Sequence, residues 1–271
     1  MAYRHLILGA GNMVRALLPN FISVAKESDE SEFFVFTPSG TKAKKFAEDF
    51  DVNWIESLED LRNQHIDFIW CGFKPQQLIE VAKEVEFLSH PYLTIVSLLA
   101  GVDSASLASA LGSEEVIRIM PNTPAQVGLG VNALYKSKRV HQDKWKYFWD
   151  AFNTKGINTV FEKEDDIDII TPFSGSGPAY FFEIARILIS DLERRGIDKK
   201  LAHQMIAGTI EGAGRMLVQN DDAQELRENV TSKKGVTFEA LESLKESNLE
   251  KIFNIAMERA YQRTLELKGN K

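Results

Sequence analysis

The sequence predicts an α/β protein in which a doubly wound, mostly parallel sheet is followed by an all-α domain. In the first part, short apolar runs alternate with longer segments of helical spacing, which is the pattern of β-α-β units covered on both faces. Past about Glu164 no strand pattern is left. A chain of 271 residues suits about two domains. We therefore expect domains at 1–163 and 164–271, and the acid-rich run Glu162–Asp168 predicts a solvated boundary.

The strands of the first domain are predicted by apolar runs that are each bounded by polar, glycine or proline residues. A helix with an aromatic face is expected at His141–Phe152, between the last two strands. The expected strands are Arg4–Leu8, Phe33–Phe36, Ile66–Cys71, Tyr92–Ser97, Val116–Ile119, Val127–Tyr135 and Ile157–Phe161.

The second domain is predicted to contain long helices. One begins at Pro178, which suits the first turn because its missing N–H is no loss there. Others fit Lys200–Leu217 and the wide apolar face from Leu249 to Leu265. Because so small a helical domain cannot bury a large core alone, we expect a homodimer or a higher homo-oligomer.

Composition excludes several classes of protein. The net charge is −7, whereas a nucleic-acid binder usually carries a basic surplus. Cys71 is the one cysteine, and no apolar stretch is long enough to span a bilayer. With no signal peptide at the N-terminus, we expect a cytoplasmic protein without a nucleic-acid or membrane partner. The histidines lack metal-ligand spacing, so no metal site is expected: His5, His65, His90, His141 and His203.

A glycine motif follows the first expected strand and opens a helix, which indicates a Rossmann-like dinucleotide site. In the run GAGNMV, Gly9 would permit the tight turn, and Gly11 would let a pyrophosphate approach the backbone. Asn12 and Met13 begin the helix whose N-terminus favours negative charge. Val14 replaces the third glycine of the fingerprint, and we expect its side chain to hold the helix farther from the sheet. An ordinary strand-to-helix turn is the alternative.

The second strand lacks the acid that accepts from the ribose 2′-hydroxyl in NAD enzymes. Its end carries Thr37, Pro38 and Ser39, followed by Lys42. Hydroxyls and a lysine suit a 2′-phosphate, so the sequence favours NADPH, with NADH as a possible second cofactor. A polar loop with a solvated lysine helix is the alternative.

Ligands bind at the carboxyl ends of strands in such sheets. Phe73, Lys74 and Pro75 follow the third strand and are expected to line the cofactor cleft. Routine loop chemistry explains them equally well.

Several segments resemble signatures of the pyrroline-5-carboxylate reductases, in the order and spacing of that family. The resemblance covers essentially the whole chain. The segments are Phe73–Pro75, Ser97–Val102, Arg118–Ala125 with Gly128 and Gly130, and Ser174–Tyr180.

The resemblance implies a helical domain that interlocks with its dimer partner. It also implies reduction of L-1-pyrroline-5-carboxylate to L-proline, the last step of proline synthesis. The nicotinamide would lie near Ala100 and Asn122, and the small-molecule substrate would sit against the helical domain. Residues implied to contact the substrate are Ser174, Val230, Gly235 and Val236.

The resemblance gives Ser232 and Thr237 catalytic positions. Backbone N–H groups and the Ser232 hydroxyl would hold the substrate carboxylate, while the Thr237 hydroxyl would face the ring nitrogen. Helix capping is the alternative for both side chains.

This chain departs from the family pattern at Lys233 and Lys234, which replace proline and glycine. A lysine where glycine allows positive φ would reshape the turn, and two lysines would attract a carboxylate. A diverged reductase of another cyclic imino acid and a non-catalytic NADP-binding paralogue are therefore the alternative functions.

Overall fold

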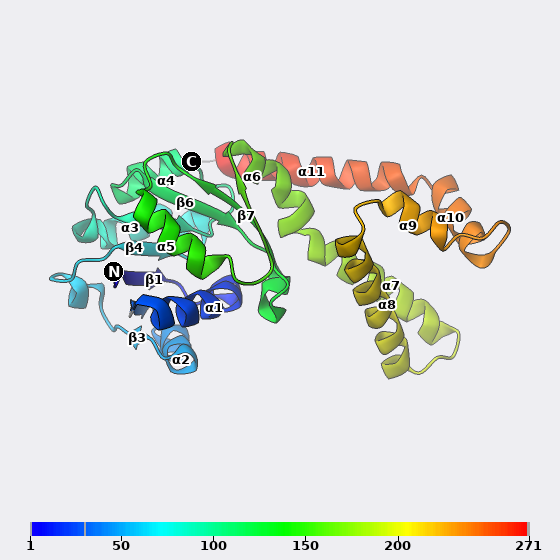
Figure 1. Ribbon diagram of the computed structural model, residues 1–271, viewed down its shortest axis with the longest axis horizontal. Helices are drawn as coiled ribbons and strands as arrows, with labels where there is room; N and C mark the ends of the chain where they lie inside the picture. The colour runs from blue at the N-terminus through cyan, green and yellow to red at the C-terminus, as the bar shows by residue number, and fades with distance from the viewer. Residues whose placement is uncertain (1, 30, 270–271) are drawn as a thin grey trace. The chain divides into compact units, whose positions relative to one another are not determined.

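The computed structural model describes residues 2–29 and 31–269 (Figure 1). It divides into two compact units. The first comprises the residues up to Ser176 together with those from Ala260 onward, and the second comprises Gly177–Arg259. Each unit is described by itself below.

The first unit is built on a sheet with the strand order β3-β2-β1-β4-β5-β6-β7-β8. Neighbouring strands are parallel except β6 and β7, which confirms the predicted mostly parallel, doubly wound sheet. Because β2 and β4 flank β1 on opposite sides, the order reverses there, and ligands bind at such a switch point. The bounds are β1 Arg4–Leu8, β2 Glu32–Phe36, β3 Asn53–Trp54, β4 Phe68–Cys71, β5 Thr94–Ser97, β6 Glu115–Met120, β7 Val131–Lys136 and β8 Ile157–Phe161.

Helices cover both faces of this sheet. One apolar core lies under α1, α2 and α5, and a second lies under α3 and α4. The central strands β4 and β5 are wholly buried, as expected for parallel strands covered on both sides. The helices are α1 Asn12–Asp29, α2 Thr41–Phe50, α3 Leu78–Glu84, α4 Ser104–Leu111, α5 Gln142–Phe152 and α6 Asp165–Ile170, the last followed by a π-helical turn, Thr171–Gly175.

The sequence analysis missed one strand and placed the start of another wrongly. The short strand β3 was not expected, because two residues carry no periodicity. The expected strand Val127–Tyr135 begins only at Val131, since Thr123–Val127 forms a 3₁₀ turn. Gly128 ends that turn at φ 74°, a conformation incompatible with a strand.

A buried polar chain runs through the aromatic core beneath β1. The Trp70 indole donates to Nδ1 of His5 over 3.1 Å, and Nε2 of His5 lies 2.8 Å from the Tyr147 hydroxyl. Since indole N–H can only donate, the His5 ring is neutral with its proton on Nε2. Burial, with a smaller contribution from Lys144, holds the pKa of His5 well below its ordinary value of 6.5.

We expect His5 to make stability depend on pH. The neutral ring is the folded form, so its contribution is complete above pH 6.5 and is lost as the pH falls further. The free energy of unfolding should fall by up to about 1.4 kcal/mol per pH unit below that point. Urea unfolding at pH 7.5, 6.5 and 5.5 measures it. His5→Phe, which cannot titrate, should show a shallower slope, and equal slopes would contradict this assignment.

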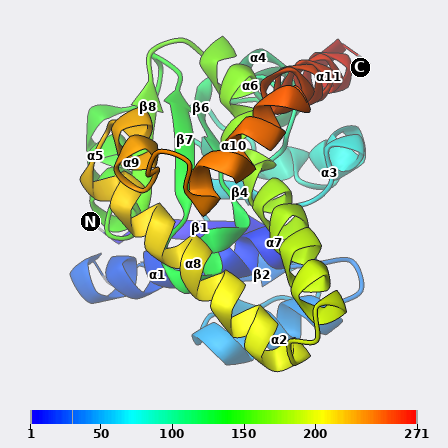
Figure 2. The same cartoon turned by 90° about the vertical axis from the view of Figure 1, so that its right-hand side faces the viewer.

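The second unit is all-helical, as predicted. Its helices α7 and α8 contact each other near the turn that joins them and diverge away from it (Figure 2). Ala202 is its only apolar side chain that is fully buried among the described residues, whereas many large apolar side chains are exposed. The helices are α7 Gly177–Arg194, α8 Lys199–Gln219, α9 Ala223–Asn229, α10 Val236–Glu246 and the first part of α11 Leu249–Gly269. Across the described part of the chain, no helix has the length and apolarity to cross a bilayer.

Candidate active site

A cleft of about 550 Å³ opens at the carboxyl ends of β1, β2 and β4. It lies at the switch point of the sheet, where a dinucleotide binds in such folds. Of the residues predicted to hold the cofactor, those that line it are Gly9, Gly11, Asn12, Met13, Thr37, Pro38, Lys42, Phe73 and Lys74.

Four other predicted cofactor residues do not line this cleft: Ser39, Pro75, Ala100 and Asn122. Conversely, the sequence reasoning missed Gln77, Val81 and Glu84, which line its wall. The helical spacing after Pro75 was the available signal, because Gln77, Val81 and Glu84 recur at steps of four and three and so share one face.

The two glycines of the motif meet different needs. Gly9 has φ 104°, and a Cβ there would lie 2.6 Å from the carbonyl oxygen of Gly72. Any side chain at Gly9 would therefore strain the turn and collide with backbone. A Cβ on Gly11 would instead meet no protein atom within 4 Å. The face of Gly11 is open, which leaves the backbone accessible to a phosphate.

The missing third glycine of the fingerprint is compensated on the opposite side of the contact. Val14 is 1 % exposed and packs over Gly72 at the end of β4. A Cβ on Gly72 would lie only 2.2 Å from Cγ2 of Val14. Gly72 thus provides the space that the Val14 side chain occupies.

The tip of β2 carries one buried polar group without a hydrogen-bond partner in the described structure. This group is the hydroxyl of Thr37. Lys42 lies in the first turn of α2 nearby, with an exposed side chain. A buried hydroxyl is costly to leave unpaired, so its position suits a ligand acceptor oxygen such as that of a 2′-phosphate. These residues fit NADP.

Asn122 is buried, and both polar atoms of its side chain are hydrogen-bonded within the protein. Its Nδ2 donates to the Ser174 carbonyl over 3.2 Å, and its Oδ1 accepts from the Val131 N–H at 2.9 Å. It thereby joins the end of β6 to the π-helical turn. The Ser174 hydroxyl is buried there and has no hydrogen-bond partner among the described residues.

A buried ionic cluster lies behind that turn. Arg118 on β6 contacts Glu164 at 2.7 Å and Asp168 at 3.3 Å. Glu164 also accepts the backbone N–H and the hydroxyl of Ser104, at the start of α4. Asp168 is 2 % exposed, so the expectation of a wholly solvated acidic boundary is wrong. Arg118 could have been suspected as its partner, because a charge inside an apolar strand needs one.

The loop before α10 retains its tight turn despite the two lysines. The Gly235 N–H donates to the Ser232 carbonyl over 3.0 Å, and Lys234 adopts φ 57°. Lysine thus takes up the left-handed conformation that glycine favours. A Cβ on Gly235 would lie 2.2 Å from the Ser232 hydroxyl oxygen and 3.1 Å from its carbonyl oxygen, so a side chain there would displace the Ser232 hydroxyl. The expectation that Lys234 reshapes this turn is not met.

The N-terminus of α10 carries no side-chain cap. Gly235 is its N-cap residue, and within the part of the chain that the structure describes no side chain makes a capping hydrogen bond there. Helix capping is therefore wrong as the role of Ser232 and Thr237. Val236 is 91 % exposed, and the uncapped turn is positioned to receive an anion.

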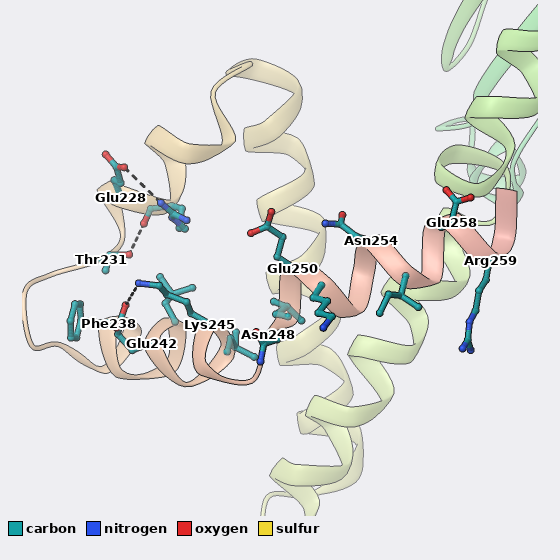
Figure 3. Close-up of a pocket in the computed structure, with 16 residues that line it drawn as sticks. Glu228, Thr231, Phe238, Glu242, Lys245, Asn248, Glu250, Asn254, Glu258 and Arg259 are labelled. Carbon is teal, nitrogen blue, oxygen red and sulfur yellow. Dashed lines mark hydrogen bonds and ion pairs between the residues drawn. The ribbon is translucent and has the colours of Figure 1, made fainter. Parts of the chain in front are cut away.

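A groove of about 1120 Å³ lies within the second unit, between α9, α10 and α11 (Figure 3). Thr231 and Phe238, which flank the predicted substrate loop, line it. The predicted residues Val230, Ser232, Gly235, Val236 and Thr237 do not. The sequence reasoning did not anticipate this groove.

Comparisons with known proteins identify the relatives of this chain. Residues 164–267 match the family described as pyrroline-5-carboxylate reductase dimerisation, and residues 5–101 match that described as NADP oxidoreductase coenzyme F420-dependent. The pyrroline-5-carboxylate reductase of Vibrio alginolyticus is 30 % identical over 263 residues, which is 96 % of each chain. The chain belongs to the pyrroline-5-carboxylate reductase family.

Solved structures of this family have the same fold. The reductase of Coxiella burnetii is 30 % identical with a TM-score of 0.83, covering 98 % of this chain and 99 % of the other. The Plasmodium falciparum enzyme, solved with NADP bound, is 29 % identical with a TM-score of 0.83, covering 98 % of each chain. The resemblance inferred from the motifs is thereby confirmed.

Proposed function

We propose that this chain reduces L-1-pyrroline-5-carboxylate to L-proline with NADPH, as an oxidoreductase acting on a C=N bond. The cleft at the switch point carries the proposal, because it combines an open Gly11 backbone with an unpaired Thr37 hydroxyl. Membership of the reductase family and the NADP-bound relative support it. No step needs a metal ion.

The cofactor would supply the hydride, and the chain would supply position and charge. Gly9, Gly11 and the start of α1 would hold the pyrophosphate, and Lys42 and Thr37 the 2′-phosphate. The rest of the cofactor would be contacted by Ser39, Phe73, Lys74 and Pro75. The nicotinamide would lie near Ala100 and Asn122.

The uncapped first turn of α10 would hold the substrate carboxylate. The Ser232 hydroxyl would add a hydrogen bond to it, and Ser174, Val230, Gly235 and Val236 would contact the substrate. The Thr237 hydroxyl would bond to the ring nitrogen, which gains the electron pair of the C=N bond as the ring carbon receives hydride. A protonated imine is already electrophilic, so positioning provides most of the rate enhancement.

We propose residues 164–271 as the substrate-binding and dimerisation domain of a cytoplasmic homo-oligomer. Exposed apolar side chains on its helices support this, among them Phe181, Ile187 and Ile252. The net charge of −7 supports the absence of a nucleic-acid partner.

Titration with NADPH followed by addition of pyrroline-5-carboxylate tests the proposal. Binding followed by loss of nicotinamide absorbance and formation of proline is the expected result. Binding without turnover on any cyclic imine would identify a non-catalytic paralogue, and turnover only on another imine would identify a diverged reductase. Absence of NADPH binding would refute all three functions.

Lys42→Glu should change the cofactor preference. Replacing the cation by an anion puts like charges beside the 2′-phosphate, so we expect the Kd for NADPH to rise about tenfold or more. The Kd for NADH should change much less. Lys45→Glu, three residues along α2, makes the same charge change without lining the cleft. Equal losses for both cofactors would refute the role of Lys42.

A further inference from the structure

The last turns of α11 pack on the loop that follows β5, within the first compact unit. Gly101 in this loop has φ 69°, and a Cβ there would lie 2.9 Å from Cβ of Leu267. The helix therefore rests directly on the Gly101 backbone. Ala100 immediately precedes this contact, and Leu98 nearby lines the cofactor cleft.

Lys268, in the same turn of α11, forms ion pairs with two carboxylates of α6. Its Nζ lies 2.7 Å from Oδ1 of Asp165 and 2.8 Å from Oδ2 of Asp168. The other oxygen of Asp168 contacts Arg118 on β6. Lys268 thus reaches a buried carboxylate that is already bonded to the sheet. The hydrogen bonds to Asp165 and Asp168 raise the pKa of Lys268, so its charge is retained at every assay pH.

This contact differs from the ordinary ion pairs of the helix surface. Arg263 and Glu266, one turn earlier on α11, are 2.8 Å apart, with side chains 63 % and 59 % exposed. Such a pair contributes little to structure. The Asp168 side chain is only 2 % exposed, and its segment leads directly into the turn that carries Ser174.

We propose that Lys268 is a positioning residue for hydride transfer. Together with Leu267, Gly101, Asp165 and Asp168 it forms a latch, which fixes the β5 loop against the α6 segment. The β5 loop carries Ala100, and the α6 segment leads to Ser174, whose carbonyl accepts a hydrogen bond from Asn122. The latch therefore sets the spacing at the proposed nicotinamide end. The inference rests on the proposed function for the identity of the reaction.

Lys268→Ala tests the latch in the NADPH-loaded full chain. We expect kcat to fall about tenfold, because small displacements of a reacting ring cost rate steeply. The Kd for NADPH should change less than about twofold, since the β1 and β2 tips that hold phosphate are untouched. The primary deuterium isotope effect on kcat, measured with 4-deuterated NADPH, should increase as hydride transfer becomes slower. Lys268→Arg should restore most of kcat.

Arg263→Ala is the matched control, and all three quantities should stay at their wild-type values. A kcat for Lys268→Ala within twofold of wild type would overturn the proposal. So would a lower kcat with an unchanged isotope effect, which indicates only a loss of folded protein.

A second readout separates failure of the latch from failure of the proposed function. The nicotinamide fluorescence of bound NADPH should shift towards that of the free cofactor in Lys268→Ala, whether or not the wild type turns over pyrroline-5-carboxylate. Turnover by the wild type with identical fluorescence in both proteins would refute the latch alone. Absence of wild-type turnover would refute the proposed function alone.

Discussion

Gly72→Ala should destabilise the protein and weaken NADPH binding. Its new Cβ would lie 2.2 Å from Cγ2 of Val14, and because that side chain is buried we expect α1 to be displaced with it. Overpacking of this kind costs about 1–3 kcal/mol. The displacement also moves the first turn of α1, which begins at Asn12 and lines the cleft. Urea unfolding and NADPH titration measure the two effects.

The double variant Val14→Ala/Gly72→Ala supplies the control. Removing Cγ2 of Val14 clears the space for the new methyl group, so the double variant should be nearly as stable as Val14→Ala alone. A coupling free energy of at least about 1 kcal/mol is expected between the two positions. Additive losses of stability would show that Gly72 does not accommodate the valine.

Thr237→Ala should lower kcat by roughly a hundredfold, because it removes the hydroxyl proposed to bond to the ring nitrogen in the transition state. Stability should be nearly unchanged, since no side chain caps α10 and Thr237 is only half-buried. Steady-state kinetics and urea unfolding provide the comparison.

Thr237→Ser retains the hydroxyl and should recover most of kcat. Thr209→Ala, whose hydroxyl bonds to the Met205 carbonyl on α8, removes an equivalent group from another helix and should leave kcat unchanged. A wild-type kcat in Thr237→Ala would exclude that residue from the mechanism.

The cofactor cleft could be predicted from local sequence because its determinants are local. Gly9, Gly11 and Thr37 follow strands whose apolar pattern is clear, and parallel strands bring their carboxyl ends to one edge. The compensation of Val14 by Gly72 could not be predicted. It depends on which residue at the end of β4 lies opposite α1, here Gly72 directly after the strand, and that is a property of the packed structure.

The environments of the charged residues also depend on the packed structure rather than on local sequence. The composition of Glu162–Asp168 predicts that its acidic side chains are exposed to solvent. Asp168 is nevertheless buried, because Arg118 and Lys268, which are distant in sequence, form ion pairs with it. Lys234 was expected to disturb a turn, but the hydrogen bond from Gly235 to Ser232 is made with φ 57° at the lysine. Local sequence patterns could not predict the tertiary contacts of Asp168, nor the strained backbone conformation that Lys234 adopts.

The central claim is that the cleft beside Gly11 holds NADPH so that its hydride passes to the ring carbon of a cyclic imino acid. Transfer of deuterium tests it most directly. Two samples of NADPH, each deuterated on one face of C4, are incubated separately with the protein and pyrroline-5-carboxylate. The mass of the proline formed is then measured by mass spectrometry. One labelled form should yield proline heavier by a single deuterium, and the other should yield unlabelled proline. Unlabelled proline from both forms, or no proline at all, would contradict the account.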